Sequence, residues 1–293
     1  MSRVFEALEK ASKERAAPRI EPPINGQTTT PQPAAHKPPT PTVNGNGTAR
    51  ASHNGKSWRE TAEEMFFGRD LRNYKSYPLV ATEAGSSAAE QYKILREQVK
   101  RLRGQGGARV ISVTSPIKRD GKSIVAANLA AALALDYNER VLLIDCDLRH
   151  PQSHQYFGVQ VSPGLAEYLT SGSSDILKYV QQTSLPSLQL LPAGKSVSIA
   201  AELLAMDKMQ HALGELRAKF PNHQIIIDNP PVLSTADPLI LAAQVDGIIM
   251  VVRAGKTPRD CLAEALETLK SDKVMGVVFN GADLGVSSKY YYY

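Results

Sequence analysis

From residue 109 onward, short and almost continuous apolar runs alternate with amphipathic segments. The runs are Arg109–Thr114, Val141–Asp145, Leu188–Pro192, Gln224–Asp228, Gly247–Arg253 and Val274–Asn280. Segments with helical periodicity separate most of them, including Lys122–Leu135, Lys208–Phe220 and Pro258–Ser271. Strands that are buried on both faces have such sequences. The pattern therefore predicts an α/β fold with a doubly wound, mostly parallel sheet, and ligands at the carboxyl ends of its strands.

The chain before this region has a different composition. Residues 1–16 place apolar side chains on one side of a helix and charged ones on the other, which predicts a short amphipathic helix; a frayed end is the alternative. Residues 17–57 are rich in Pro, Thr, Asn, Gly and Ala, so they cannot bury enough surface to offset their ordering entropy. We expect a disordered linker there, a folded domain over 58–282, and a flexible tail over 283–293.

Charge and cysteine content exclude several classes of protein. The net charge is +5, but Lys and Arg are dispersed, so no nucleic-acid partner is predicted. Two isolated cysteines argue for a reducing compartment rather than a disulfide scaffold. No apolar run resembles a signal peptide or is long enough to span a bilayer. We expect a cytoplasmic protein that reaches a membrane only through a partner.

A phosphate-binding loop is predicted after the first apolar strand. Gly121-Lys122-Ser123 matches the end of the pattern G-x-x-x-x-G-K-[ST], although Pro116 stands at the first glycine position. Backbone N–H groups at the start of the following helix would face phosphates, Lys122 would reach the β- and γ-phosphates, and Ser123 would ligate Mg²⁺. The residues expected around the nucleotide are Lys118, Arg119, Asp120, Gly121, Lys122, Ser123 and Ile124. An ordinary turn before a helix is the alternative.

Acidic residues follow two other apolar strands. Asp145 and Asp147 come after one strand and Asp228 after another. In a parallel sheet these strand ends gather beside the phosphate loop, and buried carboxylates there need a cation. Mg²⁺ supplies one, held directly or through water. A single Asp would be read as a helix cap or turn residue, but three acids beside Gly-Lys-Ser favour a metal-bound nucleotide.

These motifs resemble the bacterial tyrosine-kinase family, cytoplasmic autokinases tied to capsular and exopolysaccharide synthesis. Asp145, Asp147 and Arg149 match the family's D-x-D-x-R motif, which follows an apolar strand. Asp228 begins a match to D-[ST]-P-P, from which Asn229 departs. The resemblance covers roughly Leu79 to the C-terminus. It implies an ATP- and Mg²⁺-dependent kinase with a P-loop fold and a separate membrane-embedded polysaccharide co-polymerase that activates it.

The resemblance also suggests how copies of the chain assemble. Family members carry an E-x-x-R-x-x-R helix that contacts a neighbouring subunit in a ring. Glu90, Lys93 and Arg96 match this pattern with one Lys in place of Arg, and a solvated charged stripe is the alternative. A homo-oligomer, in the form of a ring, is therefore expected.

The end of the chain predicts the substrate. Four consecutive tyrosines resemble the family's C-terminal tyrosine cluster, which is phosphorylated in trans by the adjacent subunit. Adjacent residues cannot all face one core, so packing does not explain the run; docking of the rings on the surface is the alternative. The expected sites of autophosphorylation are Tyr290, Tyr291, Tyr292 and Tyr293.

The implied roles can be assigned to positions. Lys122 stabilises the transferring group; Ser123, Asp145 and Asp228 hold Mg²⁺ or its waters; Asp147 lies nearest the tyrosine hydroxyl; and Asn280 contacts the adenine. One departure concerns the loop, because Lys118-Arg119-Asp120 replaces the family's Pro-Gly-x before Gly-Lys-[ST]. This altered loop leaves a non-catalytic nucleotide-binding scaffold as one alternative function. The other is an ATPase switch of the partition or septum-positioning type, which shares the expected fold but usually has a glycine-rich loop with a further lysine.

Overall fold

The structure is a computed structural model that describes residues 79–83, 85–270 and 272–282. The predicted helix at residues 1–16, the linker at 17–57, the start of the folded domain at 58–78 and the tail at 283–293 lie outside the described residues. The four predicted phosphate acceptors also lie outside the described residues: Tyr290, Tyr291, Tyr292 and Tyr293. The fold and the predicted nucleotide site can therefore be compared with the structure, whereas phosphorylation of these four tyrosines stays a prediction.

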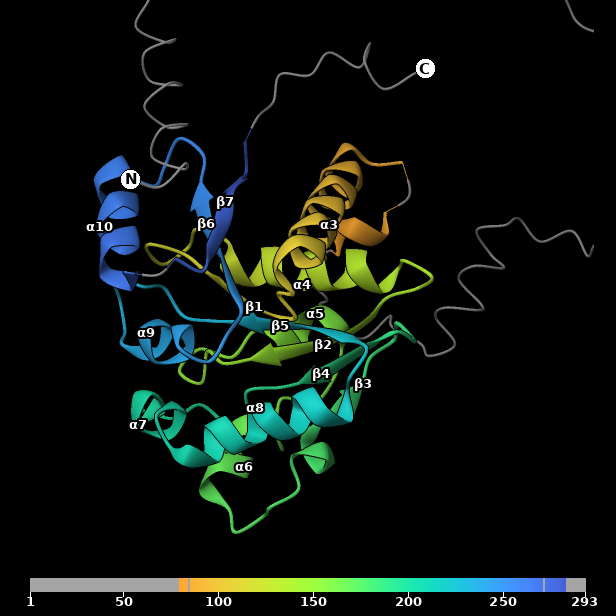
Figure 1. Cartoon of the computed structure of the whole chain (residues 1–293), viewed down its shortest axis with the longest axis vertical. Helices are drawn as coiled ribbons and strands as arrows, with labels where there is room; N and C mark the ends of the chain where they lie inside the picture. Colours follow the sequence, from red (N-terminus) through yellow and green to blue (C-terminus); the bar gives the residue numbers. More distant parts are fainter. Residues whose placement is uncertain (1–78, 84, 271, 283–293) are drawn as a thin grey trace, which may run out of the picture. The chain divides into compact units, whose positions relative to one another are not determined.

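The centre of the fold is a seven-stranded sheet with strand order β3-β4-β2-β5-β1-β6-β7 (Figure 1). Every pairing is parallel except that of β3 with β4. The strands are β1 (Val110–Thr114), β2 (Arg140–Asp145), β3 (Gln181–Gln182), β4 (Leu188–Leu191), β5 (His223–Asp228), β6 (Gly247–Arg253) and β7 (Val274–Asn280). The predicted mostly parallel sheet is confirmed, and the six predicted strands agree with it to within one residue at each end.

Helices cover both faces of this sheet (Figure 1). α3 and α4 lie on one face, while α6, α7 and α8 lie on the other. The helices are η2 (Val80–Thr82), α3 (Ser87–Gly106), α4 (Lys122–Ala134), α5 (Ser153–Phe157), α6 (Leu165–Thr170), η3 (Ile176–Tyr179), α7 (Ala200–Leu204), α8 (Asp207–Lys219), α9 (Asp237–Ala242) and α10 (Arg259–Leu269). The short helices α5, α6, α7 and α9 and the edge strand β3 were not predicted, because five or six residues carry too little periodicity.

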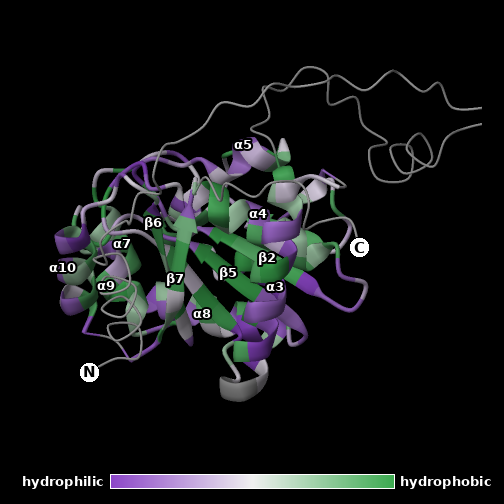
Figure 2. Ribbon diagram, turned by 90° about the horizontal axis from the view of Figure 1, so that it is seen from above, coloured by the Kyte–Doolittle hydropathy of each residue, from purple (hydrophilic) through white to green (hydrophobic). Residues whose placement is uncertain are grey.

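The core forms where α4 packs on the strands. β1 is buried along its whole length, and Figure 2 shows the strands as predominantly hydrophobic. α4 is buried on nearly every side because its sequence between Ile124 and Leu133 is apolar apart from Asn128. The Asn128 side chain is fully satisfied: its oxygen accepts from the backbone N–H of Ala81 at 2.9 Å and its nitrogen donates to the carbonyl of Ile124 at 2.9 Å. A buried amide with both groups bonded fixes η2 against α4.

The strand register determines where the acidic residues lie. Asp145 of β2 is directly opposite Asp228 of β5, and Asp228 is opposite Val113 of β1. β1 ends one residue later, at Thr114, and its neighbours β5 and β6 lie on either side. The ends of β1, β2 and β5 are therefore adjacent at one edge, which is where ligands bind in open parallel sheets.

The opposite end of β1 is held by an acid just before β6. Asp246 Oδ2 accepts from the backbone N–H groups of Arg109 and Val110 at 3.0 and 2.7 Å, and Arg217 of α8 donates to both carboxylate oxygens at 3.2 and 2.9 Å. Burial alone would raise the pKa of Asp246, but these donors lower it below its ordinary value. The ionised carboxylate therefore stabilises the folded state.

Replacing this carboxylate should destabilise the fold in a pH-dependent way. We expect Asp246→Asn to lower the free energy of unfolding by about 2 kcal/mol at neutral pH, since hydrogen bonds to a charged group are lost. Because the folded pKa is the lower one, this contribution is present above the unfolded pKa and is lost as pH falls through the folded value. Urea unfolding across pH checks this, with Glu264→Gln on exposed α10 as the control. A difference that grows on acidification would contradict it.

Candidate nucleotide site

The loop between β1 and α4 is shaped by a glycine and held by a side chain from β7. Gly121 caps α4 with a φ of 92°, a left-handed conformation that favours glycine. A Cβ added there would lie 2.0 Å from Asn280 Nδ2, which donates to the carbonyl of Asp120 at 3.0 Å. Asn280 therefore lies against the predicted phosphate loop, at the end of the last strand. Its contact with the loop is consistent with its prediction as a nucleotide-site residue.

Arg119 stands where the family's loop has the glycine of Pro-Gly-x. Its φ is 70°, so the left-handed conformation that glycine adopts easily is imposed on a residue with a side chain. Both Lys118 and Arg119 are exposed. The loop thus keeps a glycine-like backbone and gains two cations that solvent, or a phosphate, can reach.

Asp120 is buried and bonded within the protein. Its Oδ1 accepts from the Thr257 hydroxyl at 2.7 Å, and its Oδ2 accepts from the N–H of Ile117 at 3.3 Å. Thr257 in turn accepts from the N–H of Arg253 at 2.7 Å. The Asp120 carboxylate joins the loop to the segment after β6, and its contact with nucleotide stays a prediction. The anchoring role of Thr257 has no local sequence signal.

Lys122 lies among the predicted acids. Its Nζ donates to Asp147 Oδ2 at 2.8 Å and to Ser123 Oγ at 3.1 Å, and lies 3.7 Å from Asp228 Oδ1. Burial opposes the charged ammonium, but the attraction of Asp228 and Asp147 outweighs it and raises the pKa of Lys122 above its ordinary value. Lys122 is therefore a largely buried cation shared between an acid that follows β2 and one that ends β5.

Asp145 is fully buried and anchors the segment that follows β2. Its Oδ1 accepts from the N–H of Asp147 at 3.1 Å, and its Oδ2 accepts from the N–H groups of Gln152 and Ser153 at 3.2 and 3.0 Å. Burial and the nearby charge of Asp228 raise the pKa of Asp145 to about 7. With three backbone donors already bonded, Asp145 is better suited to reach a metal through water than directly.

Asp228 has the freer carboxylate. Its Oδ2 accepts from the Ser153 hydroxyl at 3.2 Å, and the Ser123 side chain lies close to this carboxylate. Its Oδ1 is buried, accepts no hydrogen bond, and faces the Lys122 ammonium. Burial raises the pKa of Asp228 despite the opposing effect of Lys122. An unbonded oxygen beside the Ser123 hydroxyl is a suitable ligand for a hard cation.

These side chains fit Mg²⁺ that binds together with a nucleotide, rather than Mg²⁺ bound by the protein alone. The described residues contain no cluster of three or more His, Cys, Asp or Glu side chains that could hold a metal by themselves. Ser123, Asp145 and Asp228 are nevertheless adjacent, as predicted. Mg²⁺ commonly keeps several waters and binds through one or two protein ligands together with substrate phosphates. The site therefore fits a cation that arrives with the nucleotide.

Arg149 is paired with an acid that the sequence did not reveal. Its Nε lies 3.6 Å from Asp237 Oδ2, and its Nη1 donates to the carbonyl of Ser198. Asp237 is fully buried at the first turn of α9, and burial raises its pKa. Asp147, two residues before Arg149, accepts from the N–H of His150 at 3.0 Å. The ion pair of Arg149 with Asp237 therefore ties the motif to α9.

Asn229 takes the place of the family's hydroxyl residue without disturbing the strand ends. Its Nδ2 donates to the Ser112 hydroxyl at 3.2 Å, and its backbone N–H donates to the carbonyl of Val113 at 3.0 Å. The side chain is almost completely buried between β5 and β1. The departure therefore adds a tie between the two strands that carry the loop and Asp228.

The predicted subunit-contact stripe consists of Glu90, Lys93 and Arg96, and part of it makes contacts within the chain. Lys93 Nζ lies 2.6 Å from Glu90 Oε1, and both side chains are substantially exposed. Arg96 is less exposed: its Nη1 donates to the carbonyl of Ala132 at 3.3 Å and its Nε to Glu97 at 2.8 Å. Glu90 and Lys93 are accessible to a neighbouring copy, whereas Arg96 also holds α3 on α4.

Restoring glycine at position 119 should stabilise the protein. A non-glycine residue in the left-handed region costs about 1–2 kcal/mol, and the extra freedom of unfolded glycine returns about 0.5–1 kcal/mol of that. We expect Arg119→Gly to raise the free energy of unfolding by about 0.5–1 kcal/mol, measured in urea. Arg119→Ala, which removes the charge but keeps the Cβ, should have little effect. Equal stabilisation by both substitutions would show that charge, and not backbone strain, is responsible.

Among the described residues, no helix is both long enough and apolar enough to cross a membrane.

Comparison with known proteins identifies the family. The AAA domain family model matches residues 108–274. The chain is 35% identical over 218 residues to tyrosine-protein kinase YwqD of Bacillus subtilis, and the aligned region covers 73% of this chain and 90% of YwqD. It is 34% identical over 212 residues to the putative tyrosine-protein kinase EpsB of Ralstonia nicotianae, covering 71% of this chain but only 27% of EpsB.

Solved structures agree with these relatives. The kinase domain of the Escherichia coli tyrosine kinase ETK superposes with a TM-score of 0.66 at 26% identity, covering 78% of this chain and 89% of that domain. The BceF tyrosine kinase domain superposes with a TM-score of 0.63 at 28% identity, covering 75% of this chain and 85% of that domain. With the loop, the three strand-end acids and the tyrosine cluster of the sequence, we conclude that this chain belongs to the bacterial tyrosine-protein kinase family.

Proposed function

We propose that the chain transfers the γ-phosphoryl group of ATP, bound with Mg²⁺, to tyrosines 290–293 of a neighbouring copy. The observation that supports this most directly is the position of Lys122. Its ammonium lies at the start of α4 between Asp147 and Asp228, at the edge where β1, β2 and β5 end. Relatives named tyrosine-protein kinases favour phosphotransfer to tyrosine over a partition-type ATPase switch.

The nucleotide would bind across the loop. The first N–H groups of α4 have no acceptor within the helix, so they can bond phosphate oxygens. Exposed Lys118 and Arg119 add positive charge, while Asn280 and Ile124 lie on the β7 side of Gly121. We assign the phosphates to residues 118–123 and the base to the side where Ile124 and Asn280 lie.

Mg²⁺ would be held by a hydroxyl and a carboxylate. The Ser123 side chain lies close to Asp228, whose Oδ1 accepts no hydrogen bond. We assign Ser123 and Asp228 to the metal or its waters and Asp145 to an outer contact through water. Bound with ATP, the cation would neutralise charge on the phosphates, and it would also relieve the repulsion between the two buried acids.

Asp147 is suited to meet the tyrosine. It is now paired with Lys122 at 2.8 Å. When Lys122 turns to the nucleotide phosphates, its hydrogen bond to Asp147 Oδ2 is released, and that oxygen is free to accept from the tyrosine hydroxyl. Asp147 then takes the proton of the tyrosine hydroxyl while the tyrosine oxygen bonds to the γ-phosphorus and the bond to the leaving ADP oxygen breaks.

A mixing experiment tests transfer between copies. A Lys122→Met chain with an intact tail should receive label from radiolabelled ATP only when a chain truncated after Ala282, which keeps Lys122 but lacks the terminal tyrosines, is added. Lys122→Met alone should remain unlabelled because the cation on the transferring group is missing. Phosphotyrosine mass spectrometry locates the label among the four tyrosines.

The control for this mixture is the Lys122→Met chain with all four terminal tyrosines changed to Phe. Label on this control would place the acceptor elsewhere. Label on the Lys122→Met chain incubated alone would exclude Lys122 from catalysis.

The two acids near Lys122 should have separable effects. We expect Asp147→Asn to bind nucleotide nearly as well as the unmodified chain while transfer falls by about 10²–10⁴-fold, the usual contribution of acid–base catalysis. Asp228→Asn should instead weaken nucleotide binding in the presence of Mg²⁺ and have little effect without it. A fluorescent ATP analogue, titrated with and without Mg²⁺, reports binding, and label incorporation reports transfer. Equal loss of binding in both variants would contradict the assigned roles.

A second function is kept because of the loop. In this loop Arg119 adopts a left-handed conformation, and Asp120 is bonded to Thr257. A glycine-rich loop would need neither feature. The loop of this chain also suits a scaffold that binds nucleotide without transferring phosphate. Nucleotide binding to the unmodified chain without label on any tyrosine in the mixing experiment would favour the scaffold.

We further propose the setting in which the kinase acts. Glu90 and Lys93 are exposed on α3 and available to a neighbouring copy, and we assign them with Arg96 to a ring contact. The wider assignment is a cytoplasmic kinase that a membrane-embedded polysaccharide co-polymerase recruits and activates. It rests on the family resemblance, and the accessible stripe is its structural support.

A further inference from the structure

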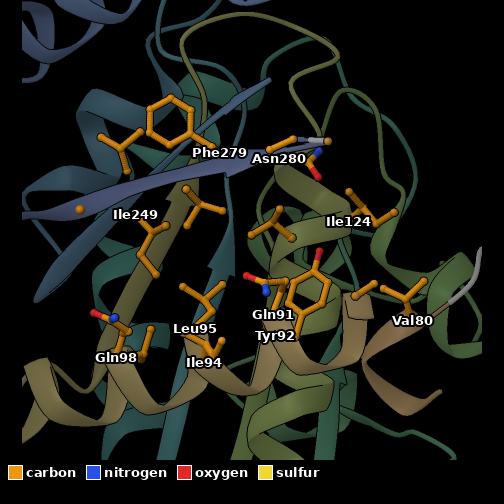
Figure 3. A pocket seen from close by; sticks show the side chains of 18 of the residues that line it. Val80, Gln91, Tyr92, Ile94, Leu95, Gln98, Ile124, Ile249, Phe279 and Asn280 are labelled. Atoms are coloured by element: carbon orange, nitrogen blue, oxygen red, sulfur yellow. The ribbon is translucent and has the colours of Figure 1, made fainter. Parts of the chain in front are cut away.

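An apolar groove lies between α3 and the last strand, β7. It has a volume of about 930 Å³ and is lined by α3, the start of α4 and residues 275–282. Figure 3 shows Tyr92 and Leu95 of α3 on one side of it, with Phe279 and Asn280 at the β7 side. Ile94 and Phe279 are 50% and 56% exposed, which is unusual for large apolar side chains.

The lining is uncharged. None of the described residues that form the groove is Asp, Glu, Lys or Arg, and its polar members are amides, hydroxyls and backbone groups. Burial raises the pKa of Tyr92 to about 12, so this phenol stays neutral. β7 is also the last strand in the order of the sheet, so no described strand pairs with its outer edge. The groove therefore suits an occupant with apolar or aromatic side chains and little charge.

Two segments of the chain are continuous in sequence with residues near the rims of the groove, and they differ in how many charged residues they contain. Residues 58–78 lead toward Val80 at one rim and contain eight charged residues. Residues 283–293 follow directly from Ala282 at the other rim and contain only Asp283 and Lys289 beside two large aliphatic residues and four tyrosines. The tail matches the uncharged lining better.

The tail is also long enough. Eleven extended residues reach about 36 Å, whereas the seven residues of β7 span about 23 Å. Gly281 has a φ of 66° and open space around its missing Cβ, so the chain can reverse direction just after β7.

We propose that residues 283–293 dock into the groove of their own chain while the tyrosines carry no phosphate, and that phosphorylation drives them out. Phosphotyrosine carries close to two negative charges, and an uncharged groove offers no partner for them. Docking would withhold the acceptor tyrosines from a neighbouring copy until the tail dissociates. The inference rests on the proposed function only in taking the tail as the phosphate acceptor.

Hydrogen–deuterium exchange of the full chain without nucleotide tests docking in cis. We expect the amides of β7 to exchange at least several-fold more slowly in the unphosphorylated full chain than in a chain ending at Ala282. Ile94→Asp should abolish this difference, while Ile199→Asp, equally exposed at 51% but at the start of α7, should leave it intact. Equal exchange with and without the tail would overturn the proposal.

A peptide of residues 283–293 tests the effect of phosphate. Bound to the chain ending at Ala282 and followed by fluorescence anisotropy, the unmodified peptide should bind at least tenfold more tightly than one with four phosphotyrosines. Equal binding of the two peptides would overturn the release by phosphorylation. Neither experiment uses ATP, so their outcome is independent of whether the chain is a kinase, and unlabelled tyrosines in the mixing experiment would leave docking untouched.

Two further outcomes would assign the groove to another occupant and overturn the proposal. β7 amides that become fast on removal of residues 1–78 rather than the tail would assign it to the preceding segment. Protection that rises with protein concentration would assign it to a second copy.

Discussion

The candidate site depends on one buried lysine that balances the charge of several buried acids. Asp145 and Asp228 are both fully buried and lie opposite each other in the register of β2 and β5. Two carboxylates without a cation would be very costly at this position. Lys122 provides that cation because α4 begins at the edge where these strands end. The same charge balance couples the site to nucleotide binding. A nucleotide that draws the Lys122 ammonium away from the acids must bring another cation to replace it, and Mg²⁺ is such a cation.

The loop shows how side chains can replace glycines. A glycine-rich phosphate loop is held by its backbone alone, whereas here Asp120 bonds to Thr257, Asn280 bonds to the Asp120 carbonyl, and Arg119 adopts the conformation of the missing glycine. The two anchoring side chains come from later in the sequence: Thr257 follows β6, and Asn280 ends β7. The loop therefore depends on the completed sheet for its shape, and binding at the loop is coupled to the end of β7.

The strands and the phosphate loop could be predicted because their signals are local. A buried parallel strand is a continuous apolar run, and Gly121-Lys122-Ser123 follows one such run directly. The convergence of Asp145 and Asp228 followed from parallel topology alone. The pairing of Arg149 with Asp237, the anchor from Thr257 and the contact of Arg96 with Ala132 could not be predicted, because each joins residues distant in sequence without a pattern of its own. The short helices were missed for the same lack of periodicity.

Asn280 links the two regions that matter most for function. Its side chain holds the phosphate loop through the Asp120 carbonyl, and the same residue lines the groove beside α3. Gly121 packs against it so closely that a Cβ would overlap its Nδ2. A segment that binds in the groove at this end would therefore contact Asn280, which sets the shape of the loop. Conversely, a nucleotide that moves the loop would alter the rim of the groove. Occupancy of the groove and occupancy of the nucleotide site are thus expected to affect each other through a single side chain, without any rearrangement of the sheet.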